Sequence, residues 1–130
     1  MDKKELIKEF FEKIKDSADY NKIQFIILFG SYSQNKQTKF SDIDIAIYFK
    51  GNKKERFDFR LKLLTGLKDK YDVHIFQDLP LPLRISVLKG ELIYFKDMDF
   101  VYETAYQTIR AYDDIKGYYL EYINLKKNLS

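Results

Sequence analysis

Two aspartates of this sequence lie close enough together to share chemistry. Asp42 and Asp44 fall in Ser41–Tyr48, a segment in which polar and apolar side chains alternate. Alternation with period two is typical of a strand, so both carboxylates lie on one face, roughly 7 Å apart at their bases. Two ionised carboxylates this close repel each other unless a proton or a cation lies between them. Oxygen ligands favour a hard cation such as Mg²⁺, which completes its coordination with substrate phosphates.

A glycine and a serine offer a complementary group. Gly30 and Ser31 follow Phe25–Phe29, a short apolar run that is typical of a strand buried on both faces. Glycine allows a tight turn and close approach of the backbone, and Ser31 can start the next segment as a helix N-cap. The free N–H groups of a helix beginning there would favour a phosphate. An anion-binding turn beside cation-binding carboxylates predicts a metal-bound nucleoside triphosphate as the ligand.

Together these residues resemble a known signature. Gly30-Ser31, nine further residues and Ser41-Asp42-Ile43-Asp44 are similar to the GS-x9-SDxD pattern of the nucleotidyltransferase superfamily with the DNA polymerase β-like fold. The short chain resembles the minimal nucleotidyltransferase (MNT) branch of that superfamily, and the resemblance covers nearly the whole sequence. MNT proteins are commonly encoded beside a HEPN-domain toxin. The best-studied ones are antitoxins that transfer AMP from ATP to a tyrosine of that toxin.

The resemblance implies a role for each matching residue. It makes Asp42 and Asp44 catalytic metal ligands, and it adds Asp72, at the start of the predicted strand Tyr71–Phe76, as the third. It implies two Mg²⁺ ions, with ATP as the substrate. The residues that it assigns to the bound nucleotide are Gly30, Ser31 and Ser41. The expected activity is two-metal transfer of AMP to a tyrosine hydroxyl of a cognate HEPN toxin.

Other polar residues carry weaker signals. Many relatives have an Arg early in the loop where this chain has Gln34, so that Lys36 or Lys39 would have to supply the positive charge. His74 is the only histidine and shares a strand face with the third carboxylate. A single histidine is more often a surface or packing residue, so it stays outside the expected catalytic set. Arg84 either reaches a phosphate or lies in solvent on its helix.

Two other functions stay open. An antitoxin that neutralises its HEPN partner by occlusion, without catalysis, agrees with the missing loop Arg, although the intact site residues speak against it. A nucleotidyltransferase acting on a small-molecule hydroxyl usually carries extra helices for its acceptor, and no such helices are expected here.

Composition narrows the class of protein further. With 130 residues, 45% of them hydrophobic, the chain is expected to form a single domain over 1–130. It has no cysteine, its N-terminus is charged throughout and no apolar run reaches membrane-spanning length, so we expect a cytoplasmic protein without a membrane segment. Its 23 basic and 20 acidic residues are interleaved, so direct binding of nucleic acid is not expected.

The surrounding pattern predicts the elements that position these residues. The resemblance implies an α/β (α+β) fold with a DNA polymerase β-like core, in which a small mixed sheet has helices mainly on one face and the carboxylates on the open face. Strands are predicted over Phe25–Phe29, Ser41–Tyr48, Tyr71–Phe76 and Leu92–Phe95. Helices are predicted over Asp2–Ala18, Lys53–Lys68 and Leu83–Lys89, and from Asp97 or Asp99 to Lys126.

The last of these helices is long and apolar on several sides. Its expected buried face consists of Val101, Ala105, Ile109 and Tyr112. Beyond Gly117, where a kink is allowed, its many aromatic and aliphatic side chains belong either to the core or to a surface for a partner.

Overall fold

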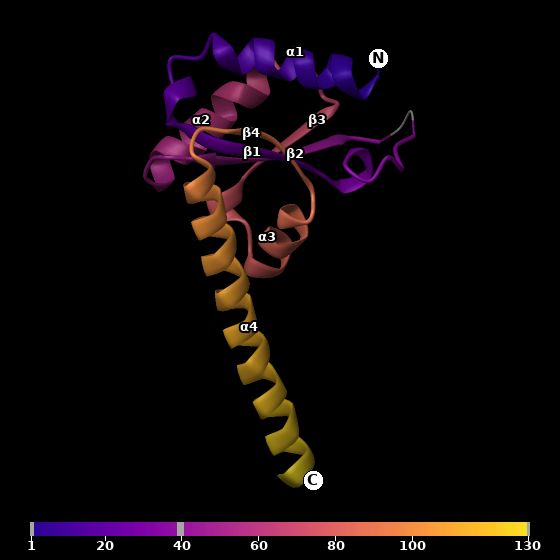
Figure 1. Ribbon diagram of the computed structural model, residues 1–130, viewed down its shortest axis with the longest axis vertical. Helices are drawn as coiled ribbons and strands as arrows, with labels where there is room; N and C mark the ends of the chain where they lie inside the picture. Colours follow the sequence, from indigo (N-terminus) through magenta and orange to yellow (C-terminus); the bar gives the residue numbers. More distant parts are fainter. Residues whose placement is uncertain (1, 39–40, 130) are drawn as a thin grey trace.

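The computed structural model of the protein describes residues 2–38 and 41–129, and Figure 1 shows its helices and strands. The elements within these residues follow one another as α1 (Lys3–Lys15), β1 (Ile23–Phe29), β2 (Ile43–Phe49), α2 (Lys53–Gly66), β3 (Tyr71–Ile75), α3 (Leu81–Leu88), β4 (Glu91–Phe95) and α4 (Met98–Leu129). Short 3-10 turns cover Tyr20–Lys22, Gly30–Tyr32 and Phe76–Asp78.

The strands form one mixed sheet in the order β3-β2-β1-β4. β1 pairs antiparallel with both β2 and β4, whereas β2 and β3 are parallel. Parallel neighbours need a crossover connection, and α2 provides it. The starts of β2 and β3 therefore lie at the same edge of the sheet, so side chains at these two positions become neighbours. The expected fold class, a mixed sheet with a long C-terminal helix, is confirmed.

One face of the sheet is covered by α1 and α2, which lie above the strands in Figure 1. Leu6, Phe10 and Ile14 form the buried stripe of α1 and pack against the isoleucines of β2. The Tyr71 hydroxyl at the start of β3 donates a 2.7 Å hydrogen bond to the Leu6 carbonyl. Burial and the nearby charge of Glu9 raise the pKa of Tyr71 to about 12, so this hydroxyl keeps its proton and ties α1 to the sheet.

The opposite face is more covered than the sequence led us to expect. α3 and the first part of α4 pack on it, below the strands in Figure 1, so the helices are distributed over both faces. Phe25, Ile27 and Ala46 point to this side and pack there with Val87 of α3 and Val101 of α4. An apolar strand face needs such a cover, and only the end of the face that carries the carboxylates is left open.

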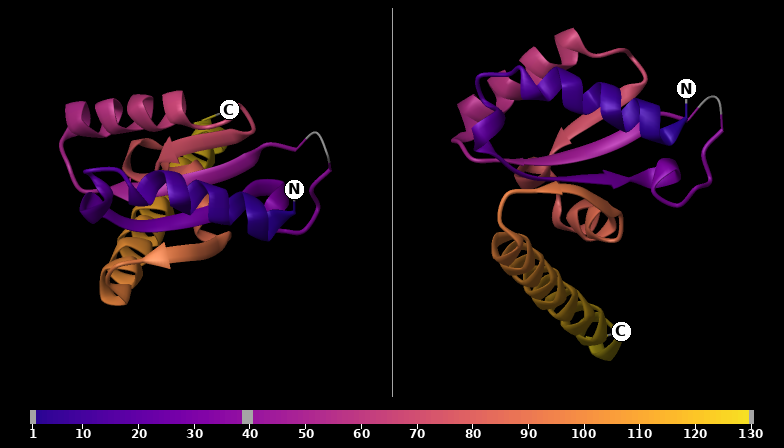
Figure 2. Two further views of the ribbon diagram at one scale, coloured as in Figure 1. Left: turned by 90° about the horizontal axis from the view of Figure 1, so that it is seen from above. Right: turned by 45° about the horizontal axis from the view of Figure 1, so that its top comes forward.

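α4 begins against the sheet and then projects away from it as an arm, as Figure 1 and the right-hand view of Figure 2 show. Asp97 caps it by accepting the Asp99 N–H at 3.0 Å. The buried stripe passes through Thr108, which is 6% exposed, and the prediction for Ile109, 47% exposed, was wrong. A stripe that continues Val101 with alternating steps of four and three residues reaches Thr108 and not Ile109, which explains the difference.

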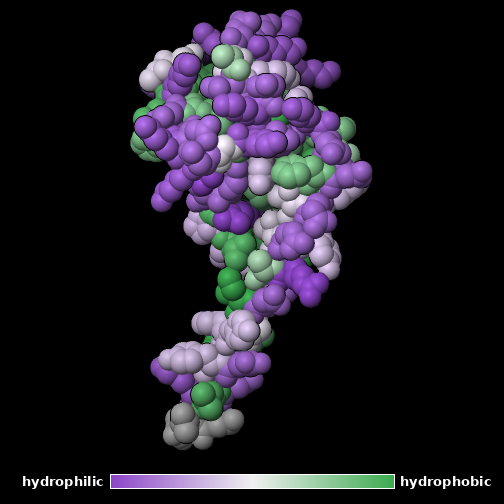
Figure 3. Space-filling model, turned by 90° about the vertical axis from the view of Figure 1, so that its left-hand side faces the viewer, coloured by the Kyte–Doolittle hydropathy of each residue, from purple (hydrophilic) through white to green (hydrophobic). Residues whose placement is uncertain are grey.

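The second half of α4 carries exposed apolar side chains, so of the two alternatives that the sequence left open for them, the core is excluded. The largest of them are Ile115, Tyr118, Tyr119, Leu120, Tyr122 and Leu125. Figure 3 shows hydrophobic side chains, in green, along this projecting part of the molecule. The helix continues through Gly117 without a break. No helix within residues 2–38 and 41–129 has both the length and the hydrophobicity that crossing a membrane requires.

Candidate active site

Two carboxylates face each other across the parallel strands. In the register of β2 and β3, Asp44 pairs with Asp72, and the next pair on the same face is Ala46 with His74. Asp44 and Asp72 are both half-buried, at the open end of this face. Asp42 precedes the first residue of β2, and its side chain is exposed. The structure thus brings two of the three expected catalytic aspartates together and leaves the third beside them in solvent.

The closest cluster of ligand atoms contains a histidine. One oxygen each from Asp44 and Asp72 and one ring nitrogen of His74 all lie within 4.8 Å of one another. His74 Nε2 is 3.0 Å from Asp72 Oδ2. The opposite pairing partner of His74 is the small Ala46, which leaves room for the imidazole on this face. Sequence reasoning placed His74 on the correct face but not in the site, and its strand parity with Asp72 was the signal that could have included it.

The electrostatics of the cluster favour the binding of a cation. Burial raises the pKa of the Asp44 carboxyl above its usual range, and the negative charge of Asp72 raises it further. His74 lowers the pKa of Asp44, whereas the charge of Asp42 raises it. A divalent cation would relieve this repulsion, and carboxylate oxygens with an imidazole nitrogen form a donor set that fits such an ion.

Gly30 lies directly against the cluster. Its φ of +73° is in the left-handed region that favours glycine. A Cβ added to Gly30 would run into Asp44 Oδ2, so the position also requires the absence of a side chain. The glycine of the signature therefore lets the backbone pass beside the carboxylate, as the sequence predicted for a close approach.

The expected helix after Gly30 is only a single turn. Gly30–Tyr32 forms a 3-10 turn, which Ser33 closes by donating its hydroxyl to the Gly30 carbonyl at 2.9 Å. The Ser31 carbonyl accepts the Lys36 N–H, also at 2.9 Å. Gly30 and Ser31 thus belong to a turn that lies next to the carboxylates and is held by local hydrogen bonds.

Ser41 closes the loop at its other end. Its hydroxyl accepts the Thr38 N–H at 2.9 Å, and its own N–H donates to the Thr38 carbonyl at 3.1 Å. Gln34 and Lys36 are exposed in the loop. Lys39, the other candidate for the loop's positive charge, lies outside the described residues.

Arg84 is already engaged elsewhere. Its guanidinium donates to the carbonyl of Leu79 at 2.7 Å and to that of Gln77 at 2.8 Å. These bonds hold the segment between β3 and α3. They engage the group that had been considered for a phosphate.

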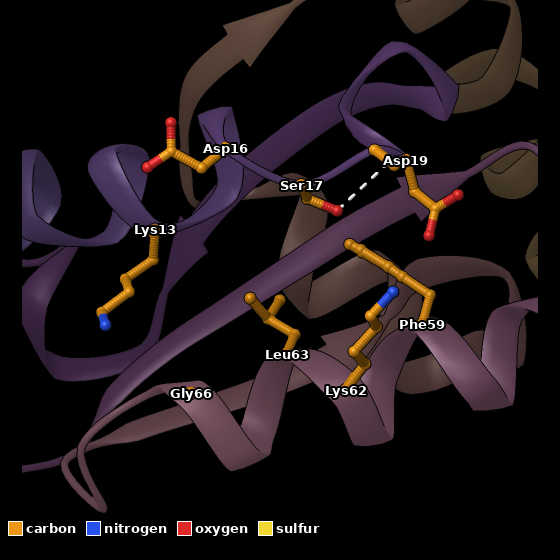
Figure 4. Close-up of a pocket in the computed structure, with 9 residues that line it drawn as sticks. Lys13, Asp16, Ser17, Asp19, Phe59, Lys62, Leu63 and Gly66 are labelled. Carbon is orange, nitrogen blue, oxygen red and sulfur yellow. Dashed lines mark hydrogen bonds between the residues drawn. The ribbon is translucent and has the colours of Figure 1, made fainter.

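Two hollows lie near these elements. A pocket of about 410 Å³ between α1 and α2 is lined by Lys13, Asp16 and Leu63 among others (Figure 4), and it contains none of the expected site residues. A second pocket, of about 540 Å³, lies along β3 and includes His74, with Lys53 and Arg60 on its border. The second pocket therefore meets the cluster at His74, and neither Asp44 nor Asp72 is among its lining residues.

Comparison with known proteins gives a consistent result. The family described as "Polymerase beta, Nucleotidyltransferase" matches residues 12–99. The chain is 33% identical to "Putative protein adenylyltransferase MJ1547" of Methanocaldococcus jannaschii over 96 residues, which cover 74% of this chain and 75% of that protein. A second protein of this organism with the same description, MJ1379, is 34% identical over 93 residues, or 68% of this chain and 93% of its own.

Solved structures are similar over almost the whole chain. A chain of the crystal structure of a toxin-antitoxin with AMP-PNP has a TM-score of 0.68 and 25% identity, with 94% of this chain and 96% of that chain covered. A chain from a tri-AMPylated Shewanella oneidensis HEPN toxin in complex with MNT antitoxin has a TM-score of 0.64 and 23% identity, covering 90% of this chain and 92% of its own. The second likeness concerns the fold alone.

Proposed function

The protein belongs to the polymerase beta nucleotidyltransferase family, and from this premise we propose that it is an antitoxin-type protein adenylyltransferase acting on a HEPN-domain toxin. Residues 1–130 would form its single domain, in the cytoplasm. The acceptor is a tyrosine hydroxyl of the toxin. Its oxygen bonds to the α-phosphorus of ATP, the bond between the α-phosphorus and the bridging oxygen breaks, and pyrophosphate leaves.

The observation that carries the proposal is the pairing of Asp44 with Asp72 above Gly30. Asp44 and Asp72 would hold divalent cations, expected to be two Mg²⁺, with Asp42 completing the set from solvent. Such ions neutralise charge on a triphosphate and lower the pKa of an attacking hydroxyl. Asp72 would help the attacking hydroxyl lose its proton, and His74, which contacts it at 3.0 Å, lines the pocket along β3.

The turn around Gly30 would receive the phosphates. Gly30 and Ser31 present backbone rather than side chain beside Asp44, which lets a triphosphate come close to the carboxylates. Ser41 would orient the start of β2 beside the nucleotide through its bonds with Thr38. Lys53 and Arg60 line the pocket that includes His74, where they would add positive charge.

A protein acceptor agrees with two further observations. The relatives are described as protein adenylyltransferases, and similar chains come from toxin-antitoxin complexes. The arm of α4 exposes apolar side chains of the kind that protein partners cover. The toxin would therefore supply both the acceptor tyrosine and a surface for this arm.

Intact mass spectrometry tests the proposal. The HEPN protein encoded nearest to this gene is incubated with the protein, ATP and Mg²⁺. We expect it to gain one or more AMP units, and to gain none with Asp44→Asn. Asp58→Asn, which changes an exposed carboxylate on α2, serves as the matched control and keeps full transfer.

An unchanged toxin mass in a stable complex would overturn adenylylation and favour neutralisation by occlusion. The double variant Asp42→Ala with Asp44→Ala separates the two functions in cells. Neutralisation depends on the carboxylates if AMP transfer causes it, and survives the double change if occlusion causes it.

A further inference from the structure

His74 has no role in the function proposed above, although its side chain belongs to the carboxylate cluster. It is about a third exposed, and its Nε2 lies 3.0 Å from Asp72 Oδ2. The Phe29 ring is a second neighbour, with the ring centres 5.9 Å apart. The imidazole therefore contacts both an aromatic ring and a carboxylate, and its Nε2 faces the carboxylate of the cluster.

The distances suit a shared cation. Ligand atoms bound to one ion at about 2.1 Å lie roughly 3 to 4.2 Å apart, depending on whether they are adjacent or opposite. The ligand atoms of Asp44, Asp72 and His74 already lie within 4.8 Å of one another. Small side-chain rotations would bring all three onto one ion. Asp42 is not in this group, because it precedes the strand.

We propose that His74 is a direct ligand, through Nε2, of one of the divalent cations at Asp44 and Asp72, and that this mixed site binds Mn²⁺ more tightly than Mg²⁺. This rests on the proposed function only for the presence of a cation at the cluster. Imidazole nitrogen is a poor ligand for Mg²⁺, which prefers oxygen and keeps its water, whereas first-row transition metal ions accept nitrogen and oxygen together. The bond uses the Nε2 lone pair, so the ring carries its N–H on Nδ1.

The competing role is indirect. As a hydrogen-bond donor to Asp72, His74 would only orient the carboxylate. Loss of that bond would weaken Mg²⁺ and Mn²⁺ alike, because both ions would use the same oxygens. A direct ligand instead affects the two ions differently, and it leaves a nitrogen atom bonded to the metal.

The sequence makes this test unusually clean, because His74 is the only histidine. Untagged, full-length protein is loaded with Mn²⁺ and studied by pulsed electron paramagnetic resonance, without ATP or toxin. We expect ¹⁴N modulation from a bound imidazole, replaced by the ¹⁵N pattern when the protein is made with ¹⁵N-histidine. Absence of nitrogen coupling in the Mn²⁺-loaded protein, or absence of Mn²⁺ binding, would overturn the proposal.

His74→Gln provides the second measurement, since glutamine keeps a polar contact with Asp72 but removes the ring nitrogen. We expect the affinity for Mn²⁺ to fall about tenfold and that for Mg²⁺, measured by competition, to change less than about twofold. Equal losses for both ions would assign His74 to the indirect role. Asp58→Asn again serves as the control and keeps both affinities.

These results do not depend on the toxin. A nitrogen signal together with an unmodified toxin would retain the ligand and reject adenylylation. A modified toxin without nitrogen coupling would do the reverse.

Discussion

At the scale of single residues, the ionised Asp44 carboxylate destabilises the folded protein when no cation is bound. Its raised pKa means that ionising it is harder in the folded chain than in the unfolded one. The protonated Asp44 carboxyl therefore makes its full contribution to the stability of the folded state below the ordinary pKa of 3.8. This contribution is lost as pH rises through the higher pKa of the folded protein.

Asp44→Asn should consequently unfold at a higher temperature than the wild type at pH 7 without metal. The difference should shrink toward pH 3, where the carboxyl is protonated in both states. Added Mg²⁺ or Mn²⁺ should reverse the order, because only the wild type keeps the full ligand set. Calorimetry at both pH values measures this, and a variant less stable than the wild type at pH 7 would contradict it.

Gly30→Ala tests the close approach of backbone and carboxylate. The left-handed backbone costs an alanine about 1–2 kcal/mol, and the new Cβ would also displace Asp44. We expect lower thermal stability and loss of AMP transfer together. Gly117→Ala is the matched control, because nothing lies within 4 Å of its Cβ and it occupies a helix interior. It should strengthen the helix locally by about 1 kcal/mol without changing the unfolding temperature of the body, and transfer should stay unchanged.

The family resemblance placed Asp72 beside Asp44, and the parallel register of β2 and β3 pairs these two residues. For Asp42, strand parity does not determine the direction of the side chain, because β2 begins one residue later. Sequence reasoning left out His74 because parity gives the face of a side chain but not its distance from a neighbour on the adjoining strand.

At the scale of elements, Arg84 connects α3 to the turn that follows β3. Its two charge-assisted bonds to carbonyls hold the segment behind the site. Arg84→Met should lower the free energy of unfolding by about 2 kcal/mol, with an unchanged KM for ATP in the folded protein. Arg110→Met, which loses only a bond to the exposed Tyr106 hydroxyl, is the control and should have little effect. A higher KM for ATP with unchanged stability would instead indicate that Arg84 binds the phosphates of ATP.

The elements themselves were predictable to within a few residues. Apolar patterns placed the strands and α2, and the structure adds a reciprocal capping box of Asn52 and Glu55 at the start of α2. The distribution of the helices over both faces of the sheet was not predictable, because Phe25–Phe29 is apolar on every side and shows only that both faces are buried. Which helix covers which face depends on contacts between distant segments.

At the scale of the whole molecule, the body and the arm should be independent in stability. The side chains from Ile115 to Leu125 are largely exposed, so they contribute little burial to the body. A chain that ends at Asp114 should therefore have an unfolding temperature within a few degrees of that of the full-length protein, measured by circular dichroism in the near ultraviolet. A large loss of stability would show that the arm folds back on the body.

The length of α4 also affects how the protein moves through water. A 32-residue helix extends about 48 Å, and part of that length projects as a thin rod from a rounded body. Such a particle has more friction than a sphere of the same mass. Gel filtration would therefore give an apparent mass that is too high and could suggest a dimer where light scattering finds a monomer. If a partner covers the arm, the complex should show a smaller frictional ratio than the free chain, even though it is heavier.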